Sequence, residues 1–261
     1  MLMMRSHLRV HIVPVGFEVK RVTEPILQLK GDRVYLISLN KDDKASTRMK
    51  QIKKILTNKQ IEVKEEYTDI WNIMSCMEKF REIVTREKGN QIYFNVSTGS
   101  TLASIAAMLT CMIWKCRAYY VKLKYDEKKK QEEFVENNVE DVLSIPVYKI
   151  LSPEDKHLLI LGIIKDKDRK IRKKDLIEKL KELKIIRPVM GKKLSVHAEH
   201  SQLNAMLKPL VDEHYVEVQS RGRSSIVMLT QQGENALKIF GAGVPIQEMP
   251  ITEYLEDMET E

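Results

Sequence analysis

Residues 91–114 read QIYFNVSTGSTLASIAAMLTCMIW, and this stretch decides the fold of the first half of the chain. Its first six residues, QIYFNV, are rich in β-branched and aromatic side chains and predict a strand. Residues 101–114 form an apolar run of helical length without a polar face, which predicts a helix buried deeply against a sheet. A strand that leads directly into a buried helix is typical of a parallel α/β sheet.

The flanking segments repeat this order of strand and helix. Apolar, β-branched runs predict strands at residues 8–15, 33–39, 61–65, 117–123 and 142–150, and apolar residues at helical spacing predict helices at residues 18–29, 45–56 and 70–86. The alternation predicts an α/β fold, a Rossmann-like parallel sheet with helices on both faces. In such sheets ligands bind beyond the carboxyl ends of the strands, where the strand order reverses.

Two loops at strand ends are therefore candidates for ligand binding. The loop after the first strand contains Pro14, Val15, Gly16 and Phe17, and the loop after the strand at residues 91–96 contains Asn95, Ser97, Thr98, Gly99, Ser100 and Thr101. Hydroxyl groups and a glycine directly before a helix suit a phosphate or another anion, because the N–H groups at a helix start attract negative charge. The alternative is that the hydroxyl residues only cap the helix.

Familiar cofactor and metal signatures are absent from the sequence. The first turn reads PVGFEV rather than GxGxxG, and no GxxxxGK[ST] occurs, which argues against an NAD site and a P-loop ATPase. His197, His200 and His214 have no acidic or cysteine partner at a metal-ligand spacing. We therefore predict no cofactor and no metal.

The charge distribution divides the chain of 261 residues into a basic body and an acidic tail. The whole chain has 44 Lys+Arg and 37 Asp+Glu, a net charge of +7, and residues 241–261 contain six acids and no base, so the remainder carries 44 − 31 = +13. A basic body favours a polyanionic partner, although many soluble proteins are mildly basic.

The cysteine count and the hydropathy favour a cytoplasmic protein. Cys76, Cys111 and Cys116 cannot form a disulfide framework and fit a reducing compartment. The most apolar stretch, residues 102–114, is shorter than the ~20 residues that a membrane-spanning helix needs, and the N-terminus lacks the pattern of a signal peptide.

The second half begins with a helix-start signal and contains three helices and a hairpin. Ser152 as N-cap, Pro153 and the acids that follow predict the start of a helix over residues 153–164. A basic turn (KDKDRKIRKK), helices at residues 174–183 and 199–213, a hairpin of residues 215–219 and 225–229, and a closing helix after Thr230 follow. We predict a Rossmann-like domain at residues 1–150, a second domain at 151–240 and an acidic tail at 241–261.

This order of elements resembles the winged helix-turn-helix DNA-binding domains. The outward residues of the helix at 199–213 and the arginines of the hairpin turn would contact DNA, namely His200, Ser201, Gln202, Asn204, Lys208, Arg221 and Arg223. Amide side chains can pair with adenine edges, and the basic side chains can contact phosphates or the minor groove. A winged helix used for protein contacts is the alternative.

A Rossmann-like domain ahead of a winged helix resembles the CARF-domain transcriptional regulators, best known from archaeal CRISPR systems, where CARF denotes CRISPR-associated Rossmann fold. Residues 9–17 (RVHIVPVGF) and 22–26 (VTEPI) also look like a related archaeal family of regulators. The resemblance implies a homodimer that binds double-stranded DNA and senses a nucleotide-like molecule, with cyclic oligoadenylate as one candidate. It places the sensory site at the two loops described above, where Asn95, Ser97, Gly99 and Ser100 match the family motif and Thr101 stands in place of a basic residue.

We therefore predict a ligand-responsive, DNA-binding transcriptional regulator that is not an enzyme. Two other classes stay open. Some CARF domains cleave their own cyclic ligand, and in a ring nuclease of this kind Ser97, Thr98 or Lys41 could assist the reaction. An adaptor would use both domains for protein contacts.

Overall fold

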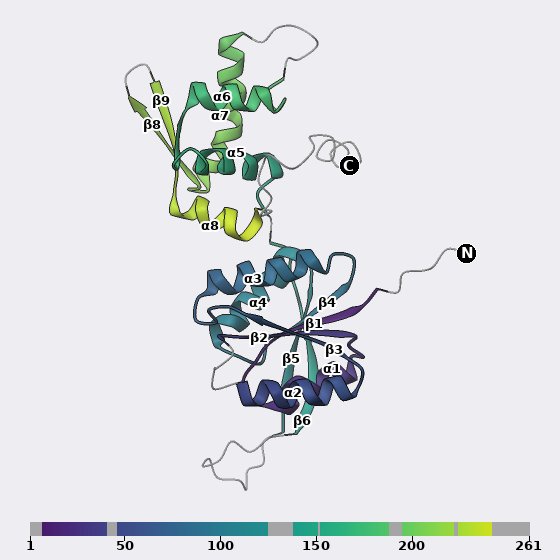
Figure 1. Ribbon diagram of the computed structural model, residues 1–261. Coiled ribbons are helices and arrows are strands. Elements are labelled where there is room, and N and C mark those ends of the chain that lie inside the picture. The colour runs from purple at the N-terminus through teal and green to yellow at the C-terminus, as the bar shows by residue number, and fades with distance from the viewer. Residues whose placement is uncertain are drawn as a thin grey trace, which may run out of the picture. The chain divides into compact units, whose positions relative to one another are not determined.

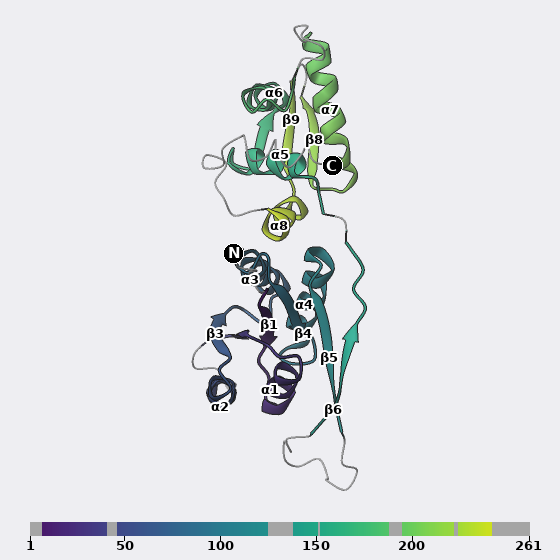
Figure 2. The same cartoon turned by 90° about the vertical axis from the view of Figure 1, so that its right-hand side faces the viewer.

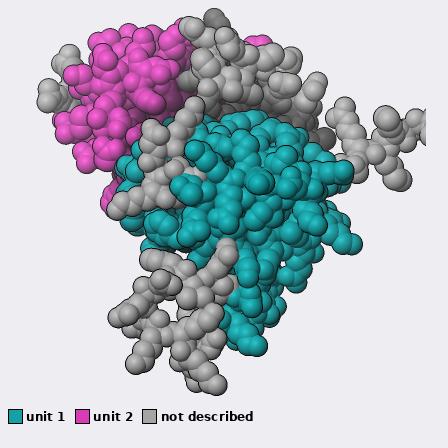
Figure 3. Space-filling view, turned by 60° about the horizontal axis from the view of Figure 1, so that its bottom comes forward, with its two compact units in different colours: residues 1–151 teal, residues 152–261 magenta. Residues whose placement is uncertain are grey.

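The computed structural model describes residues 7–40, 46–124, 138–150, 152–187, 195–221 and 224–241. The chain divides into two compact units, residues 1–151 and 152–261 (Figure 3). Lys41 and the acidic tail beyond residue 241 lie outside the described residues.

The first unit is built around a six-stranded sheet (Figure 1). Its strands are β1 (Arg9–Pro14), β2 (Arg33–Ser38), β3 (Glu62–Tyr67), β4 (Gln91–Asn95), β5 (Arg117–Leu123) and β6 (Val139–Ile145). The strand order is β3-β2-β1-β4-β5-β6; all neighbours pair in parallel except β5 and β6, which are antiparallel. In the central register Ile12 lies between Tyr35 and Phe94. This topology confirms the predicted Rossmann-like fold class.

Helices cover both faces of this sheet, as Figure 2 shows. Helices α1 (Val19–Gln28) and α2 (Ser46–Asn58) lie on one face, and α3 (Ile73–Arg86) and α4 (Thr101–Trp114) lie on the other. On the first face Val13 and Ile26 belong to one apolar core cluster. On the second face the rings of Phe80 and Phe94 meet edge to face at 5.3 Å. Burial on both faces explains the nearly continuous apolar runs of the central strands.

The prediction that α4 is deeply buried is wrong for the face that carries Leu102 and Ile105. Ala103 and Cys111 are completely buried, whereas Leu102 is 38% exposed and Ile105 is 45% exposed. An apolar sequence all round a helix is typical of burial on every side. Here the small side chains face the interior, and the large apolar side chains of the outer face stay partly exposed.

Two boundaries in the first unit differ from the sequence prediction. Helix α3 begins at Ile73 rather than near residue 70, because the Asn72 side chain accepts hydrogen bonds from the N–H groups of Met74 and Ser75. Strand β6 occupies Val139–Ile145 and ends before the predicted segment 142–150 does.

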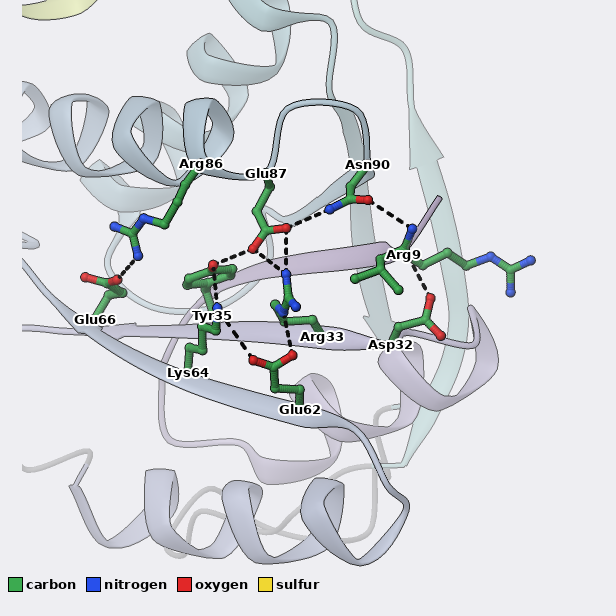
Figure 4. Close-up of polar contacts among 11 residues, drawn as sticks. Arg9, Asp32, Arg33, Tyr35, Glu62, Lys64, Glu66, Arg86, Glu87 and Asn90 are labelled. Atoms are coloured by element: carbon green, nitrogen blue, oxygen red, sulfur yellow. Dashed lines mark hydrogen bonds and ion pairs between the residues drawn. The ribbon is translucent and has the colours of Figure 1, made fainter. Parts of the chain in front are cut away.

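The amino edge of the sheet is held by charged groups around Glu87 (Figure 4). The Glu87 carboxylate is only 3% exposed and accepts hydrogen bonds from Arg33 at 2.7 and 2.8 Å, from Tyr35 at 2.5 Å and from Asn90 at 2.8 Å. Burial acts to raise the pKa of Glu87, but the hydrogen bonds from Tyr35 and Arg33 outweigh it and leave the pKa below its ordinary value. Arg33 also pairs with Glu62 at 2.7 Å, so this ionised cluster joins the starts of β2 and β3 to the end of α3.

His11 is a completely buried histidine of β1. Its ring stacks on Tyr93 with the centroids 5.1 Å apart, and Nδ1 lies 3.2 Å from the Tyr119 hydroxyl. Nε2 has no hydrogen-bond partner in the described part of the chain. Burial lowers the pKa of His11 to about 4, so the ring is neutral at neutral pH.

The second unit is a winged helix domain. It contains helices α5 (Asp155–Lys165), α6 (Lys173–Glu182), α7 (Val196–Asp212) and α8 (Gln231–Phe240), and strands β7 (Lys170–Arg172), β8 (Val216–Arg221) and β9 (Ser224–Leu229). The strands form a three-stranded antiparallel sheet in the order β7-β9-β8. Leu176, Leu207 and Val227 belong to the core cluster that joins α6, α7 and this sheet.

The sequence prediction of this unit missed a strand and misplaced two helix starts. Strand β7 lies inside the predicted basic turn: Ile171 enters the core while charged residues flank it, so the charge concealed the alternation. Helix α5 begins at Asp155, with Glu154 rather than Ser152 in the capping position. Helix α7 begins at Val196 because the Ser195 hydroxyl accepts a hydrogen bond from Ala198 N–H at 3.2 Å.

Within the described ranges, no helix is long and apolar enough to span a membrane. The same residues contain no group of three or more His, Cys, Asp or Glu side chains that could hold a metal ion.

Candidate functional site

The two predicted ligand loops meet at the point where the strand order reverses. Strands β1 and β4 are neighbours, and the loops leave their carboxyl ends side by side. The Thr98 hydroxyl donates to the Pro14 carbonyl at 2.7 Å. Gly99 has φ +82°, and a Cβ atom there would lie 2.5 Å from the Cβ atom of Pro14, while one at Gly16 would lie 3.1 Å from the nitrogen of Gly99. Both glycines therefore permit the close approach of the loops.

Asn95 ties the second loop to helix α1. Its side chain is completely buried; Oδ1 accepts hydrogen bonds from the N–H of Ser97 at 3.0 Å and from the hydroxyl of Ser97 at 2.6 Å. Nδ2 donates to the carbonyl oxygen of Arg21 at 3.1 Å. Pro25 lies four residues after Arg21 in α1 and has no N–H, so the helix cannot supply a donor to this carbonyl. The amide of Asn95 replaces the missing donor.

Ser100 is the cap of helix α4, which bears out the capping alternative for this residue. Its hydroxyl accepts from Ala103 N–H at 3.1 Å and donates to the Ile70 carbonyl at 2.5 Å. Thr101 and Leu102 are the first two residues of α4, and their N–H groups have no acceptor among the described residues. These N–H groups, at the positive end of the helix dipole, can bind an anion.

The ten predicted ligand residues thus differ in exposure. Pro14, Val15, Asn95, Thr98 and Ser100 are buried, Gly16 and Ser97 are half-buried, and Phe17, Gly99 and Thr101 are exposed. The exposed set, together with main-chain N–H groups, is what a ligand could contact directly. The buried set holds the loops in place.

The sequence reading missed the loop after β3, which lies at the same edge of the sheet. The hydrogen bond from Ser100 to the Ile70 carbonyl joins this loop to the start of α4. Trp71 follows, and it is 65% exposed. Its backbone N–H donates a hydrogen bond to the Asp69 carboxylate at 3.0 Å. The signal that could have found it is the position of residues 68–72 directly after a parallel strand.

Five of the predicted DNA-contact residues lie on α7. Ser201, Asn204 and Lys208 are exposed, and His200 and Gln202 are half-buried. Arg221 is the last residue of β8, and only its backbone is described, whereas Arg223 lies outside the described residues.

Two polar contacts between α6 and α7 were not predicted. The Lys173 ammonium donates to Asn204 Oδ1 at 2.8 Å, and Lys181 forms an ion pair with Glu199 at 2.5 Å. Both contacts therefore join side chains of α6 to side chains of α7, the candidate DNA-reading helix.

Family models match both halves of the chain. Residues 9–125 match the model described as "HFX_2341_N:-like, N-terminal", and residues 156–241 match the model "DUF6293 C-terminal winged helix domain". The chain thus has an HFX_2341-like N-terminal domain followed by a winged helix domain, and the prediction of a winged helix in the second half is confirmed.

Named relatives share only part of their length with this chain. An uncharacterized protein, MJ1513, of Methanocaldococcus jannaschii is 32% identical over 114 residues, which are 40% of this chain and 33% of that protein. Can2 from Sulfobacillus thermosulfidooxidans, solved with cyclic tetra-adenylate, has a TM-score of 0.40 and 11% identity over 89% of this chain and 64% of its own. Csm6 from Enterococcus italicus, bound to cyclic hexa-2'-fluoro-hexa-dAMP, has a TM-score of 0.41 and 15% identity over 80% of this chain and 55% of its own.

Proposed function

We propose that the chain is a ligand-responsive transcriptional regulator that binds double-stranded DNA through its winged helix. The match of residues 156–241 to a winged helix family carries this proposal. The exposed polar residues Ser201, Asn204 and Lys208 on α7 support it, because a DNA-reading helix needs an apolar face for anchoring and a polar face for the major groove. Residues 1–150 would form the sensor, 151–240 the DNA-binding domain and 241–261 the acidic tail.

The proposed effector is a small nucleotide-like anion bound at the carboxyl ends of β1 and β4. Main-chain N–H groups at the start of α4 suit a phosphate, and the close contact of Gly16 and Gly99 brings both loops to one place. The exposed apolar side chains of Leu102 and Ile105 on the same helix support a homodimer in which a second copy covers them. Such a dimer would bring two effector sites close to its axis.

In this mechanism the effector shifts a population between two dimer arrangements. A ligand can shift an equilibrium only through its different affinities for the two states, so it must contact the dimer differently in each. A change in the arrangement of the sensor domains would alter the spacing of the two winged helices. Half-sites for such a dimer lie about one helical turn apart, ~34 Å.

DNA binding is tested with the full chain and a duplex from its own promoter region. We expect binding that weakens steeply with salt, and Lys208→Ala should weaken it and reduce the salt slope by about 1. Lys59→Ala, an exposed lysine of the first unit, is the matched control and should leave binding unchanged. Absence of binding at low salt, or equal effects of the two variants, would contradict the assignment.

The effector and the enzyme alternative are tested in one incubation. Cyclic oligoadenylates are added to the protein, DNA affinity is measured, and the nucleotide is then separated by chromatography. A change in DNA affinity with the ligand recovered intact supports the sensor. Linear products would assign the first domain to the ring nucleases instead.

A further inference from the structure

Asn204 is an exposed amide on α7 whose orientation is fixed by a lysine of another helix. The Lys173 ammonium lies 2.8 Å from Oδ1 of Asn204. An ammonium group can only donate hydrogen bonds, so the oxygen of the amide must face Lys173. Nδ2, the other end of the planar amide, is then the end that can contact another molecule.

The side-chain amide of Gln202 is oriented the other way round from that of Asn204. Its Nε2 donates to the carbonyl oxygen of Arg187 at 3.2 Å, and a carbonyl can only accept. The end of Gln202 that is turned away from the protein is therefore Oε1. The two amides of α7 offer unlike groups, although their side chains carry the same chemistry.

This polarity decides which base edges Asn204 can read. An asparagine recognises adenine through two bonds at once, in which its oxygen accepts from N6 and its nitrogen donates to N7. Lys173 takes one of the two lone pairs of Oδ1 and turns the oxygen toward α6, so the outward end of Asn204 is its donor. A lone donor matches acceptors of the major groove, namely O6 and N7 of guanine or O4 of thymine.

From this contact we infer that Lys173 is a specificity-determining positioning residue, which turns Asn204 from an adenine reader into a donor for guanine or thymine. The inference rests on the proposed function, because it requires α7 to enter the major groove. Lys173 need not contact a base, since it acts through the amide of Asn204.

The neighbouring lysine provides a matched control. Lys174 is the next residue of α6 and is exposed, and no hydrogen bond or ion pair joins it to α7. Lys173→Met and Lys174→Met remove the same charge and keep a similar aliphatic chain, so both should reduce salt-dependent affinity to a similar extent. Only the first variant releases Oδ1 of Asn204.

The test is a selection of bound sequences from a random duplex library with the full-length protein and its variants. The position read by Asn204 is the one whose preference disappears in Asn204→Ala. At that position we expect the unaltered protein and Lys174→Met to prefer guanine or thymine, and Lys173→Met to change in favour of adenine by about tenfold or more.

Two results would overturn the inference while leaving DNA binding in place. One is a preference of the unaltered protein for adenine at the Asn204 position, and the other is an unchanged preference in Lys173→Met. If the unaltered protein selects no sequence and binds no DNA at low salt, the proposed function itself fails.

Discussion

Replacement of Asn95 by alanine should destabilise the first unit, and the loss should be smaller when Pro25 is replaced as well. The Asn95 amide donates to the Arg21 carbonyl, which Pro25 deprives of its usual helical donor. Alanine at position 25 would restore an N–H four residues after Arg21. The two substitutions should therefore be coupled through one carbonyl oxygen.

The magnitude follows from the contacts of the buried amide. Asn95→Ala removes hydrogen bonds of 3.1, 3.0 and 2.6 Å and leaves the Arg21 carbonyl and the Ser97 N–H without these partners. A net hydrogen bond is worth about 0.5–1.5 kcal/mol, and an unsatisfied buried group costs about 1–3 kcal/mol. Because Ser97 is half-buried and can be hydrated in part, we expect a total loss of about 2–4 kcal/mol. In the Pro25→Ala background the loss should be about 1 kcal/mol smaller.

The assay is urea denaturation of the full chain followed by tryptophan fluorescence. The chain contains two tryptophans, Trp71 and Trp114, and both belong to the first unit, so the signal reports this unit alone. Free energies of unfolding for the unaltered protein, the two single variants and the double variant give the interaction energy.

Ser97→Ala provides the control cycle. It removes the 2.6 Å bond to Asn95 but no bond to the Arg21 carbonyl, so its effect should add to that of Pro25→Ala. Additivity within about 0.5 kcal/mol for Asn95→Ala with Pro25→Ala would refute the reasoning, because independent sites behave in that way.

Four further predictions concern stability. Glu87→Gln should lower the free energy of unfolding, measured by urea denaturation, by about 2–3 kcal/mol, because it leaves Arg33 beside a neutral buried group. The Glu62 side chain is 49% exposed, so Glu62→Gln should cost under about 1 kcal/mol. Equal losses would contradict the role of burial. The folded pKa of Glu87 is lowered, so its stabilisation is present above the unfolded value of about 4.3 and should disappear as the pH falls through the folded pKa. Burial lowers the pKa of His11 from 6.5 to about 4, so the free energy of unfolding should fall by up to about 3 kcal/mol as the pH falls across this interval. Plotted against pH, the free energy of unfolding of His11→Phe should change less than that of the unaltered protein. An unchanged pH dependence would exclude His11 as the cause. Gly99→Ala should lower the melting temperature, since its Cβ would lie 2.5 Å from that of the facing proline, and an unaltered melt would show that the loops part without cost.

The sequence predicted the first unit well because its strands and helices obey different hydrophobic periods. Buried strands such as β1 and β2 are continuous apolar runs, and the helices between them show spacings of three and four. Strand β7 failed this test because it is three residues long and only Ile171 enters the core. The outer face of α4 was also predicted wrongly. Its apolar composition predicts burial, but composition does not say whether the same chain covers that face.

The sequence predicted that the two candidate loops lie together at one edge of the sheet, but it did not predict their hydrogen bonds. The hydroxyl-rich loop follows β4 and meets the loop after β1, as the rule for strand ends requires. Hydrogen-bond direction could not be obtained from the sequence, because it depends on a carbonyl such as that of Ile70, which is distant in the chain. The same limit applies to α7, where the hydrogen bond from Lys173 to Asn204 joins side chains that lie 31 residues apart in the chain.

These hydrogen bonds change how substitutions at the site should be interpreted. Thr98 and Ser100 donate their hydroxyl protons to carbonyl oxygens of neighbouring loops, so alanine at either position alters the loop before it alters a ligand contact. The groups that can meet an anion are the N–H groups of Thr101 and Leu102, which no substitution other than proline removes. Loss of ligand binding in Ser100→Ala would therefore have to be accompanied by loss of stability. Proline at position 101, where a helix tolerates it, deletes one of these N–H groups while the cap remains. A weaker affinity for the effector with unchanged stability in Thr101→Pro would then assign binding to the main chain.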